Sequence, residues 1–218
     1  MTLMLASHPK FAGRKGPLLL IVMDGIGLME DHPGNAVSRA HTPVLDKLLQ
    51  SRLSMRLITH GTAVGLPNEG DMGNSEVGHN ALGAGRVIAQ GASLVDKAIK
   101  TGKIFQSEHW RASVSRAMAG GTLHFLGLLS DGNVHASIGH LYALLEAANH
   151  EGVKRVRLHT LLDGRDVAPR SALMYLDQLQ DKLREYNMLG RDYCIASGGG
   201  RQVITMDRYA ANLAMVKQ

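Results

Sequence analysis

The sequence has only one cysteine, few aromatic residues and no long hydrophobic run. Because Cys194 is its only cysteine, the chain forms no internal disulfide, which favours a reducing, cytoplasmic environment. The apolar run 17–23 is too short to span a bilayer and is followed by an acidic residue. We therefore expect no membrane segment and no membrane partner, and we expect residues 1–16 to form a short flexible leader.

The chain is basic, with a formal net charge of +5 at pH 7, and aromatic residues make up only 4% of it. Its lysine and arginine residues are scattered, and the sequence contains no recognisable nucleic-acid-binding module. A scattered basic surplus serves equally well to attract a small, multiply charged anion. The composition therefore predicts a small anionic ligand and no nucleic-acid partner.

Strand and helix patterns alternate regularly from about residue 89 onward. We expect strands near 122–129, 155–162 and 193–197, and helices near 92–101, 107–119, 138–150 and 171–187. Strands that alternate with helices of this length are typical of βαβ units. The second part of the chain is therefore predicted to be an α/β domain with a mostly parallel sheet.

The pattern before residue 89 is less regular. The apolar run 17–23 predicts a buried strand, the Thr-Pro pair at 42–43 predicts the start of a helix, and 53–60 predicts a second strand. Residues 61–86 are rich in glycine and lack periodicity, so we expect a long, structured loop. The change in pattern predicts a domain boundary near 87–91.

Three polar motifs each follow one of the strands expected in the second part: Ser130–His135, Asp163–Asp166 and Ser197–Arg201. In parallel sheets of this kind, ligands bind beyond the carboxyl ends of the strands. We therefore expect the three motifs to lie near one another and to contribute to an anion site.

Five candidate residues in or near these motifs each have a functional and a structural interpretation. His135 could hydrogen-bond a phosphate or cap the helix that follows it. Arg165 and Asp166 could bind the acid and hydroxyl groups of a substrate, or could pair with each other to stiffen the loop. Arg201 and Arg208 could clamp an anion beside a run of glycines, or could be solvated. No motif decides between the two interpretations by itself.

Two residues in the first part are candidates for metal and phosphate chemistry. Asp24 directly follows an expected strand, where a carboxylate suits a divalent metal but also commonly caps a turn. Ser75 lies between Gly73 and Gly78, and it is either a nucleophile that a metal activates or a residue that caps a turn. His79 is not an obvious local base. Taken together, the candidates predict an α/β protein that handles phosphate.

Short motifs also occur in a fixed order along the chain, and the most specific stretch is Met72–His79, which leads to Gly83–Arg86. The ordered positions are 22–27, 34–36, 42–43, 65–67, 72–79, 83–86, 130–135, 163–166 and 206–208. They resemble the cofactor-independent (2,3-bisphosphoglycerate-independent) phosphoglycerate mutases, and the run 82–86 resembles their plant and trypanosomatid branch.

The resemblance implies a fold and a division into domains. Residues 17–88 would form the N-terminal portion of a split, alkaline-phosphatase-like metal domain. Residues 89–218 would form part of an α/β transferase domain that binds phosphoglycerate and has a mostly parallel sheet. The family is commonly monomeric, and we expect the same here.

The resemblance also implies an activity and roles for the candidates. The family interconverts 3-phosphoglycerate and 2-phosphoglycerate through a phosphoserine, without 2,3-bisphosphoglycerate as cofactor. It uses two divalent metal ions, usually manganese, with magnesium or cobalt as alternatives. Asp24 and Ser75 match metal-ligand positions, and Ser75 also matches the residue that is phosphorylated. The positions that match substrate contacts are His135, Arg165, Asp166, Arg201 and Arg208.

The chain departs from the family in a few residues and in length. Asn133 and Ala136 stand where many members have glycine and serine, and Ser137 and Leu213 stand where histidine and tryptophan are common. Family members are more than twice as long, and their C-terminal part supplies the remaining metal ligands. Because Asp24 and Ser75 alone are too few ligands for two ions, we predict that this chain has no mutase activity by itself.

Two other functions remain as alternatives. Another phosphatase-like hydrolase or a phosphopentomutase would share the split metal domain, but we would not expect it to carry the motifs at 130–135 and 163–166. A truncated, non-catalytic relative would bind phosphoglycerate or a partner without turning it over.

Overall fold

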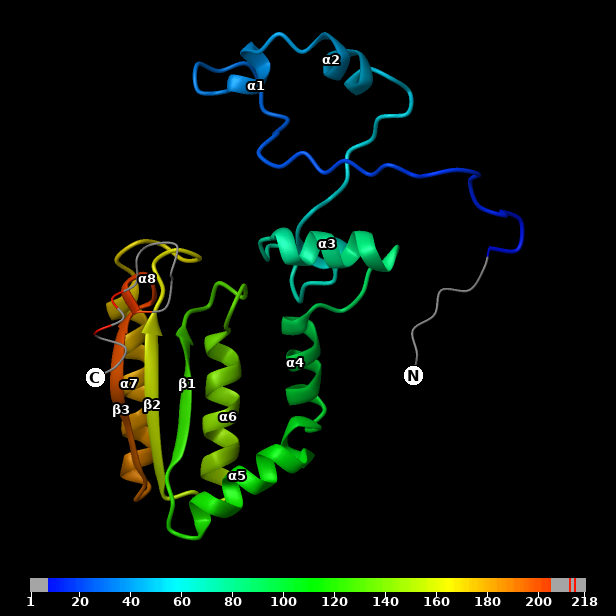
Figure 1. Cartoon of the computed structure of the whole chain (residues 1–218). Helices are drawn as coiled ribbons and strands as arrows, with labels where there is room; N and C mark the ends of the chain where they lie inside the picture. The colour runs from blue at the N-terminus through cyan, green and yellow to red at the C-terminus, as the bar shows by residue number, and fades with distance from the viewer. Residues whose placement is uncertain (1–7, 205–211, 213, 215–218) are drawn as a thin grey trace. The chain divides into compact units, whose positions relative to one another are not determined.

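The computed structural model describes residues 8–204, 212 and 214 (Figure 1). The chain forms two compact units, Met1–Arg56 and Leu57–Gln218, which are considered separately below. Whether the domains divide near 87–91, as the sequence predicts, stays a prediction. None of the helices in the described ranges combines the length and the apolar character needed to cross a bilayer.

The first unit contains two short helices, α1 (Ala36–Arg39) and α2 (Pro43–Leu49). The predicted helix start is confirmed, since Thr42 is the N-cap of α2 and Pro43 is its first residue. The Thr42 hydroxyl does not cap the backbone, however, because it donates a hydrogen bond to the Asp46 carboxylate at 2.9 Å.

The strands predicted at 17–23 and 53–60 are wrong, because neither segment has strand structure. A strand is stable only where its N–H and C=O groups pair with a neighbouring strand, and the one sheet found in the described part of the chain lies elsewhere. The six apolar side chains that follow Pro17 are between 54% and 88% exposed. The apolar pattern of 17–23 is real, but nothing in the described structure covers it.

The second unit contains most of the regular structure (Figure 1). Its strands are β1 (Leu123–Leu129), β2 (Arg155–Leu162) and β3 (Asp192–Gly200). Its helices are η1 (Gly61–Val64), α3 (Ser75–Ala84), α4 (Gly91–Lys100), η2 (Ile104–Gln106), α5 (Glu108–Met118), α6 (Ile138–His150), α7 (Ala172–Met188) and α8 (Arg201–Ile204). The four helices and three strands predicted after residue 89 are confirmed, with β3 extending three residues further than expected.

The sheet is parallel with the strand order β1-β2-β3. Helix α6 connects β1 to β2, and α7 connects β2 to β3. Because right-handed crossovers that step in the same direction place their helices on one side of a sheet, α6 and α7 pack on the same face. That face and the two helices form the core, with Leu145, Val156, Leu158, Leu179 and Tyr193 almost fully buried.

The glycine-rich segment 61–86 is not a continuous loop, because it contains η1 and α3. Two of its glycines permit close backbone contacts. A Cβ atom would lie 1.7 Å from the Ile88 carbonyl oxygen at Gly65 and 1.8 Å from the Thr59 carbonyl oxygen at Gly73. These contacts hold the segment against its own flanks and present α3 with Ser75 at its first turn.

Candidate functional site

The ends of the three strands meet in one cluster around Asp163, which follows β2. The Asp163 carboxylate accepts a hydrogen bond at 2.7 Å from the hydroxyl of Ser130, which follows β1. It also accepts one at 2.9 Å from the guanidinium of Arg201, which follows β3, and the same guanidinium nitrogen lies 2.5 Å from Asp166. The three strand-end motifs therefore lie together, as the parallel sheet requires.

The Arg201–Asp163 ion pair of this cluster is buried. The side chains of Arg201 and Asp163 are only 7% and 1% exposed. Burial raises the pKa of Asp163, but hydrogen bonds from Ser130, the backbone N–H groups of Asp166 and Arg165, and Arg201 outweigh it, so that its pKa is lowered. Burial lowers the pKa of Arg201, and the bonds to Asp166 and Asp163 raise it above its usual value. The charged pair is therefore a fixed structural element of the site.

Ser130 and Asp131 belong to a motif that the sequence predicted, but neither was given a role of its own, and Tyr175 was not among the candidates. The Tyr175 hydroxyl donates a hydrogen bond to Asp131 at 2.5 Å, which, together with burial, raises the pKa of Tyr175 to about 12. Tyr175 comes from α7 and shows no local polar pattern, so nothing in its sequence context could have indicated this contact.

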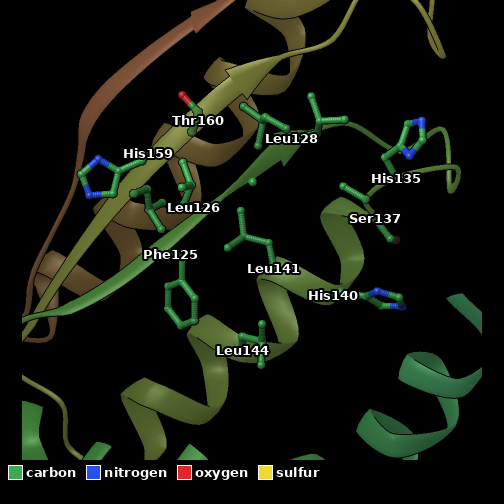
Figure 2. Close-up of a pocket in the computed structure, with 14 residues that line it drawn as sticks. Phe125, Leu126, Leu128, His135, Ser137, His140, Leu141, Leu144, His159 and Thr160 are labelled. Carbon is green, nitrogen blue, oxygen red and sulfur yellow. The ribbon is translucent and has the colours of Figure 1, made fainter. Parts of the chain in front are cut away.

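The substrate-binding candidates lie in different parts of this region. Arg165 is exposed, and its backbone N–H donates to Asp163 at 3.0 Å. His135 is exposed on the loop after β1 and lines a cavity of about 250 Å³ between β1 and the start of α6 (Figure 2). Arg208 lies outside the described residues.

The run of glycines before Arg201 is part of β3 rather than a flexible turn. Gly198 pairs with Thr160 of β2, and a Cβ atom at Gly198 would lie 2.8 Å from the Thr160 hydroxyl. The glycines therefore let two strands approach each other, which is a structural reason for their presence.

Ser75 is the first residue of α3, and its side chain is exposed. Asn74 is the N-cap, and its side-chain oxygen accepts a hydrogen bond from the Val77 N–H at 3.0 Å. The capping role that we considered for Ser75 is thus filled by its neighbour. The Ser75 hydroxyl is left at a helix N-terminus, where the helix dipole stabilises negative charge.

His79 lies one turn further along α3 and faces Ser75, which the sequence analysis did not use. Its Nδ1 is 2.7 Å from the Ser75 carbonyl oxygen and 3.3 Å from the Ser75 hydroxyl oxygen. Because a carbonyl oxygen only accepts hydrogen bonds, Nδ1 must carry the proton. In this arrangement His79 donates to the Ser75 backbone, and Nδ1 cannot act as a base toward the Ser75 hydroxyl.

A hydrogen bond connects the loop before Ser75 to the loop that carries His135. The Asn133 side chain donates to the Asp71 carboxylate at 3.1 Å. Asn133 has a φ of 55°, in the left-handed region that asparagine tolerates better than most residues. This backbone conformation suits the glycine that many members of the resembled family have at position 133. The asparagine of this chain also tolerates it and adds the hydrogen bond to Asp71.

Asp24 belongs to the first unit and is therefore described by itself. Its carboxylate accepts a hydrogen bond from the Gly25 N–H at 2.9 Å, and Gly25 has a φ of 75°. Asp24 therefore caps a turn, which is the structural interpretation given for it above. The turn-capping bond uses one carboxylate oxygen and does not involve the other.

The described residues do not fit a two-metal centre by themselves. In the ranges that the structure covers, no three or more His, Cys, Asp or Glu side chains converge in a way that could hold a metal ion. Two divalent ions require more ligands than Asp24 and Ser75 provide.

The fold and the cluster define an α/β protein whose parallel strands end at a polar, charged site. A sequence model described as the BPG-independent PGAM N-terminus matches residues 95–218, which is more than half of the chain. The chain therefore belongs to the BPG-independent phosphoglycerate mutase family, and it corresponds to the N-terminal portion of the longer family members.

Similar proteins support the same conclusion. The 2,3-bisphosphoglycerate-independent phosphoglycerate mutase of Trypanosoma brucei brucei is 48% identical over 220 residues, which cover 100% of this chain and 40% of that protein. A probable enzyme of the same name from Arabidopsis thaliana is 47% identical, covering 98% of this chain and 38% of that protein. The chain thus spans about two fifths of the length of these curated relatives.

A solved structure gives the same fold. The crystal structure of Leishmania mexicana phosphoglycerate mutase at low cobalt concentration is 49% identical and aligns with a TM-score of 0.78, covering 90% of this chain and 36% of that one. The expected α/β class, related to alkaline phosphatase, is confirmed.

Proposed function

We propose that this chain is the N-terminal portion of an enzyme that interconverts 3-phosphoglycerate and 2-phosphoglycerate, with Ser75 as the residue that accepts the phosphoryl group. The observation that carries the proposal is the position of the Ser75 hydroxyl. It is exposed at the first turn of α3, and it lies 3.3 Å from Nδ1 of His79, which donates its proton to the Ser75 carbonyl oxygen at 2.7 Å. A helix N-terminus favours an oxygen that becomes anionic or carries a phosphate.

The strand-end cluster supplies the substrate-binding part of the proposal. His135 and Arg165 are exposed there, and they would contact the phosphate and carboxylate of phosphoglycerate. Arg201 is held by Asp163 and Asp166, so it would fix the loops in place as well as contribute positive charge. The assignment of Arg208 rests on the sequence resemblance alone.

The metal ions of the proposal are two divalent ions, with manganese as the first choice. Asp24 and Ser75 would each supply one ligand, and bound ions would offset the charge of the phosphoryl oxygens. We further propose that the protein acts as a monomer in the cytoplasm and uses no 2,3-bisphosphoglycerate.

The test is phosphorylation of Ser75 during turnover. The chain is incubated with 3-phosphoglycerate and Mn²⁺, alone and with a polypeptide that corresponds to the unmatched remainder of the T. brucei relative. We expect no turnover by the chain alone. In the supplemented sample we expect 2-phosphoglycerate and a gain of one phosphoryl group that peptide mass spectrometry places on Ser75.

Two serine variants make this test specific. Ser75→Ala should abolish both the phosphoryl gain and the turnover, whereas Ser113→Ala, at an exposed serine of α5, should change neither. Turnover by the isolated chain would contradict the predicted incompleteness of the site. Turnover that survives Ser75→Ala in the supplemented sample would contradict the role of Ser75.

A non-catalytic phosphoglycerate-binding role is the second candidate. It is favoured by one observation, namely that no three metal-ligating side chains converge within the described residues. This role predicts that calorimetry detects 3-phosphoglycerate binding while the supplemented sample forms neither phosphoserine nor 2-phosphoglycerate.

A further inference from the structure

The face of the sheet opposite α6 and α7 carries a pair of histidines that the proposed function does not use. His124 of β1 is exposed, and His159 of β2 is half-buried. In Figure 2 the His159 ring points away from Leu141 and Leu144, which α6 directs toward the sheet. The pair therefore lies on the face of the sheet that points away from α6 and α7.

The two imidazole rings face each other through their nitrogens. His124 Nδ1 and His159 Nε2 are 2.9 Å apart, the ring centroids are 5.2 Å apart, and the ring planes differ by only 13°. A hydrogen bond between two imidazoles requires one N–H and one lone pair, so at most one of the facing nitrogens is protonated. At least one of the two facing nitrogens therefore has a free lone pair, which points at the other ring.

Ser197 of β3 fixes the orientation of His159. It pairs in register with His159, and its hydroxyl oxygen lies 2.7 Å from His159 Nδ1. When Nδ1 donates to this oxygen, Nε2 has the lone pair and faces His124. A metal-ligating histidine is usually held by this kind of contact from its other ring nitrogen.

We propose that His124 and His159 together bind one divalent ion of the borderline transition metals, such as Ni²⁺ or Zn²⁺, with Ser197 as the positioning residue. Metal–imidazole bonds are about 2.0–2.1 Å long, so two ligands at a right angle have nitrogens roughly 3 Å apart. The observed 2.9 Å is close to this separation, but the two nitrogens point at each other, so each ring would rotate by about 45° to direct its nitrogen at one ion. Water would complete the coordination, since His124 is exposed.

The surrounding charges permit such a site. The nearest strand neighbour on the same face is Arg157, which pairs in register with His124. Its guanidinium is bound by both carboxylate oxygens of Asp192, at 3.0 and 2.7 Å, so its positive charge is largely offset. Two imidazoles without a carboxylate select Ni²⁺ and Zn²⁺ over Mn²⁺.

Calorimetric titration of the untagged 218-residue chain with Ni²⁺ tests the proposal. We expect one ion per chain, with affinity that falls as the pH is lowered because protons compete for the same nitrogens. His124→Ala and His159→Ala should each weaken binding at least about tenfold, and Ser197→Ala should weaken it several-fold. Mn²⁺ should give no comparable binding.

His109→Ala is the matched control, because His109 is an exposed histidine that belongs to α5 and not to the sheet. It should leave Ni²⁺ affinity unchanged, and circular dichroism should show that all variants keep the helix content of the parent. Equal Ni²⁺ affinity in the parent and in either sheet-histidine variant would overturn the proposal, as would a loss of affinity in His109→Ala of the same size.

Discussion

The Asp163 carboxylate is the residue on which the candidate site most depends. Its side chain is almost fully buried. It accepts hydrogen bonds from Ser130, which follows β1, from Arg201, which follows β3, and from the backbone of its own loop after β2. A buried charge is tolerated only while its partners remain in place. The stability of the second unit and the shape of the candidate site are therefore linked through one ion pair.

Replacing Arg201 by alanine should destabilise the second unit by about 3–5 kcal/mol, because it leaves the Asp163 carboxylate buried without its main positive partner. The free energy of unfolding, measured with urea, checks this. Arg184→Ala is the matched control, since Arg184 pairs with Asp181 on the surface, where the two side chains are 69% and 65% exposed. The control should change stability by less than about 0.5 kcal/mol, and equal losses in both variants would contradict the prediction.

The same pair predicts how stability depends on pH. The pKa of Asp163 is lowered in the folded state, so the folded protein binds fewer protons there than the unfolded chain does. Its stabilising contribution is therefore complete above its ordinary value of 3.8 and is lost as the pH falls through the lowered pKa. The difference in unfolding free energy between the parent and Asp163→Asn should be constant near neutral pH and shrink below about pH 4. A difference that stays constant into strong acid would show that Asp163 does not titrate as proposed.

At the scale of secondary structure elements, α3 is the longest described helix that the sequence pattern did not predict. Its apolar periodicity is weak, and Gly78 and Gly83 lower its helix propensity. The helix forms because Asn74 caps its first turn and Val77 packs with Val64 and Leu66 in a small separate core. Tertiary contacts thus outweigh local propensity at the segment that presents Ser75.

The glycines of this segment should respond to substitution in opposite directions. Gly83→Ala should stabilise α3 by about 0.5–1 kcal/mol, since no atom lies within 4 Å of the added methyl group and alanine is the better helix former. Gly73→Ala should destabilise the segment, because its Cβ atom would overlap the Thr59 carbonyl oxygen. Hydrogen exchange of the α3 amides measures both changes, and slower exchange in Gly73→Ala would be incompatible with the close contact described here.

At the scale of the whole molecule, the two units differ in how well their apolar side chains are covered. Leu18 is 88% exposed and Leu53 is 96% exposed, whereas the core of the second unit contains residues with no exposure at all. Contiguous exposed apolar residues favour aggregation or a partner surface.

Limited proteolysis should therefore cut the first unit before the second. We expect the earliest cleavages between residues 8 and 56, where no sheet or large core protects the backbone, and late cleavage within β1, β2 and α6. A mass-spectrometric time course identifies the sites. First cleavage inside the parallel sheet would contradict the difference in packing between the units.

Local sequence pattern determined most of the second unit. The alternation of strand and helix patterns after residue 89 was enough to predict seven elements, since burial on one face and short connections leave βαβ units as the stable arrangement. The same argument failed at 17–23 and 53–60, because pairing is a property of two segments and a strand pattern shows only one of them.

The candidate site divides in the same way between sequence and structure. The sequence determined which residue types stand at the strand ends and, by its ordered motifs, that Ser75 is the candidate nucleophile. Only the tertiary structure decided that Asn74 caps α3 in place of Ser75, that His79 donates toward Ser75, and that Arg201 is bound between Asp163 and Asp166. The contacts of Asn74 and His79 reach only three and four residues along the chain, but both require the helical backbone of α3. Arg201 lies 38 and 35 residues from Asp163 and Asp166, and only the folded protein brings these groups within bonding distance.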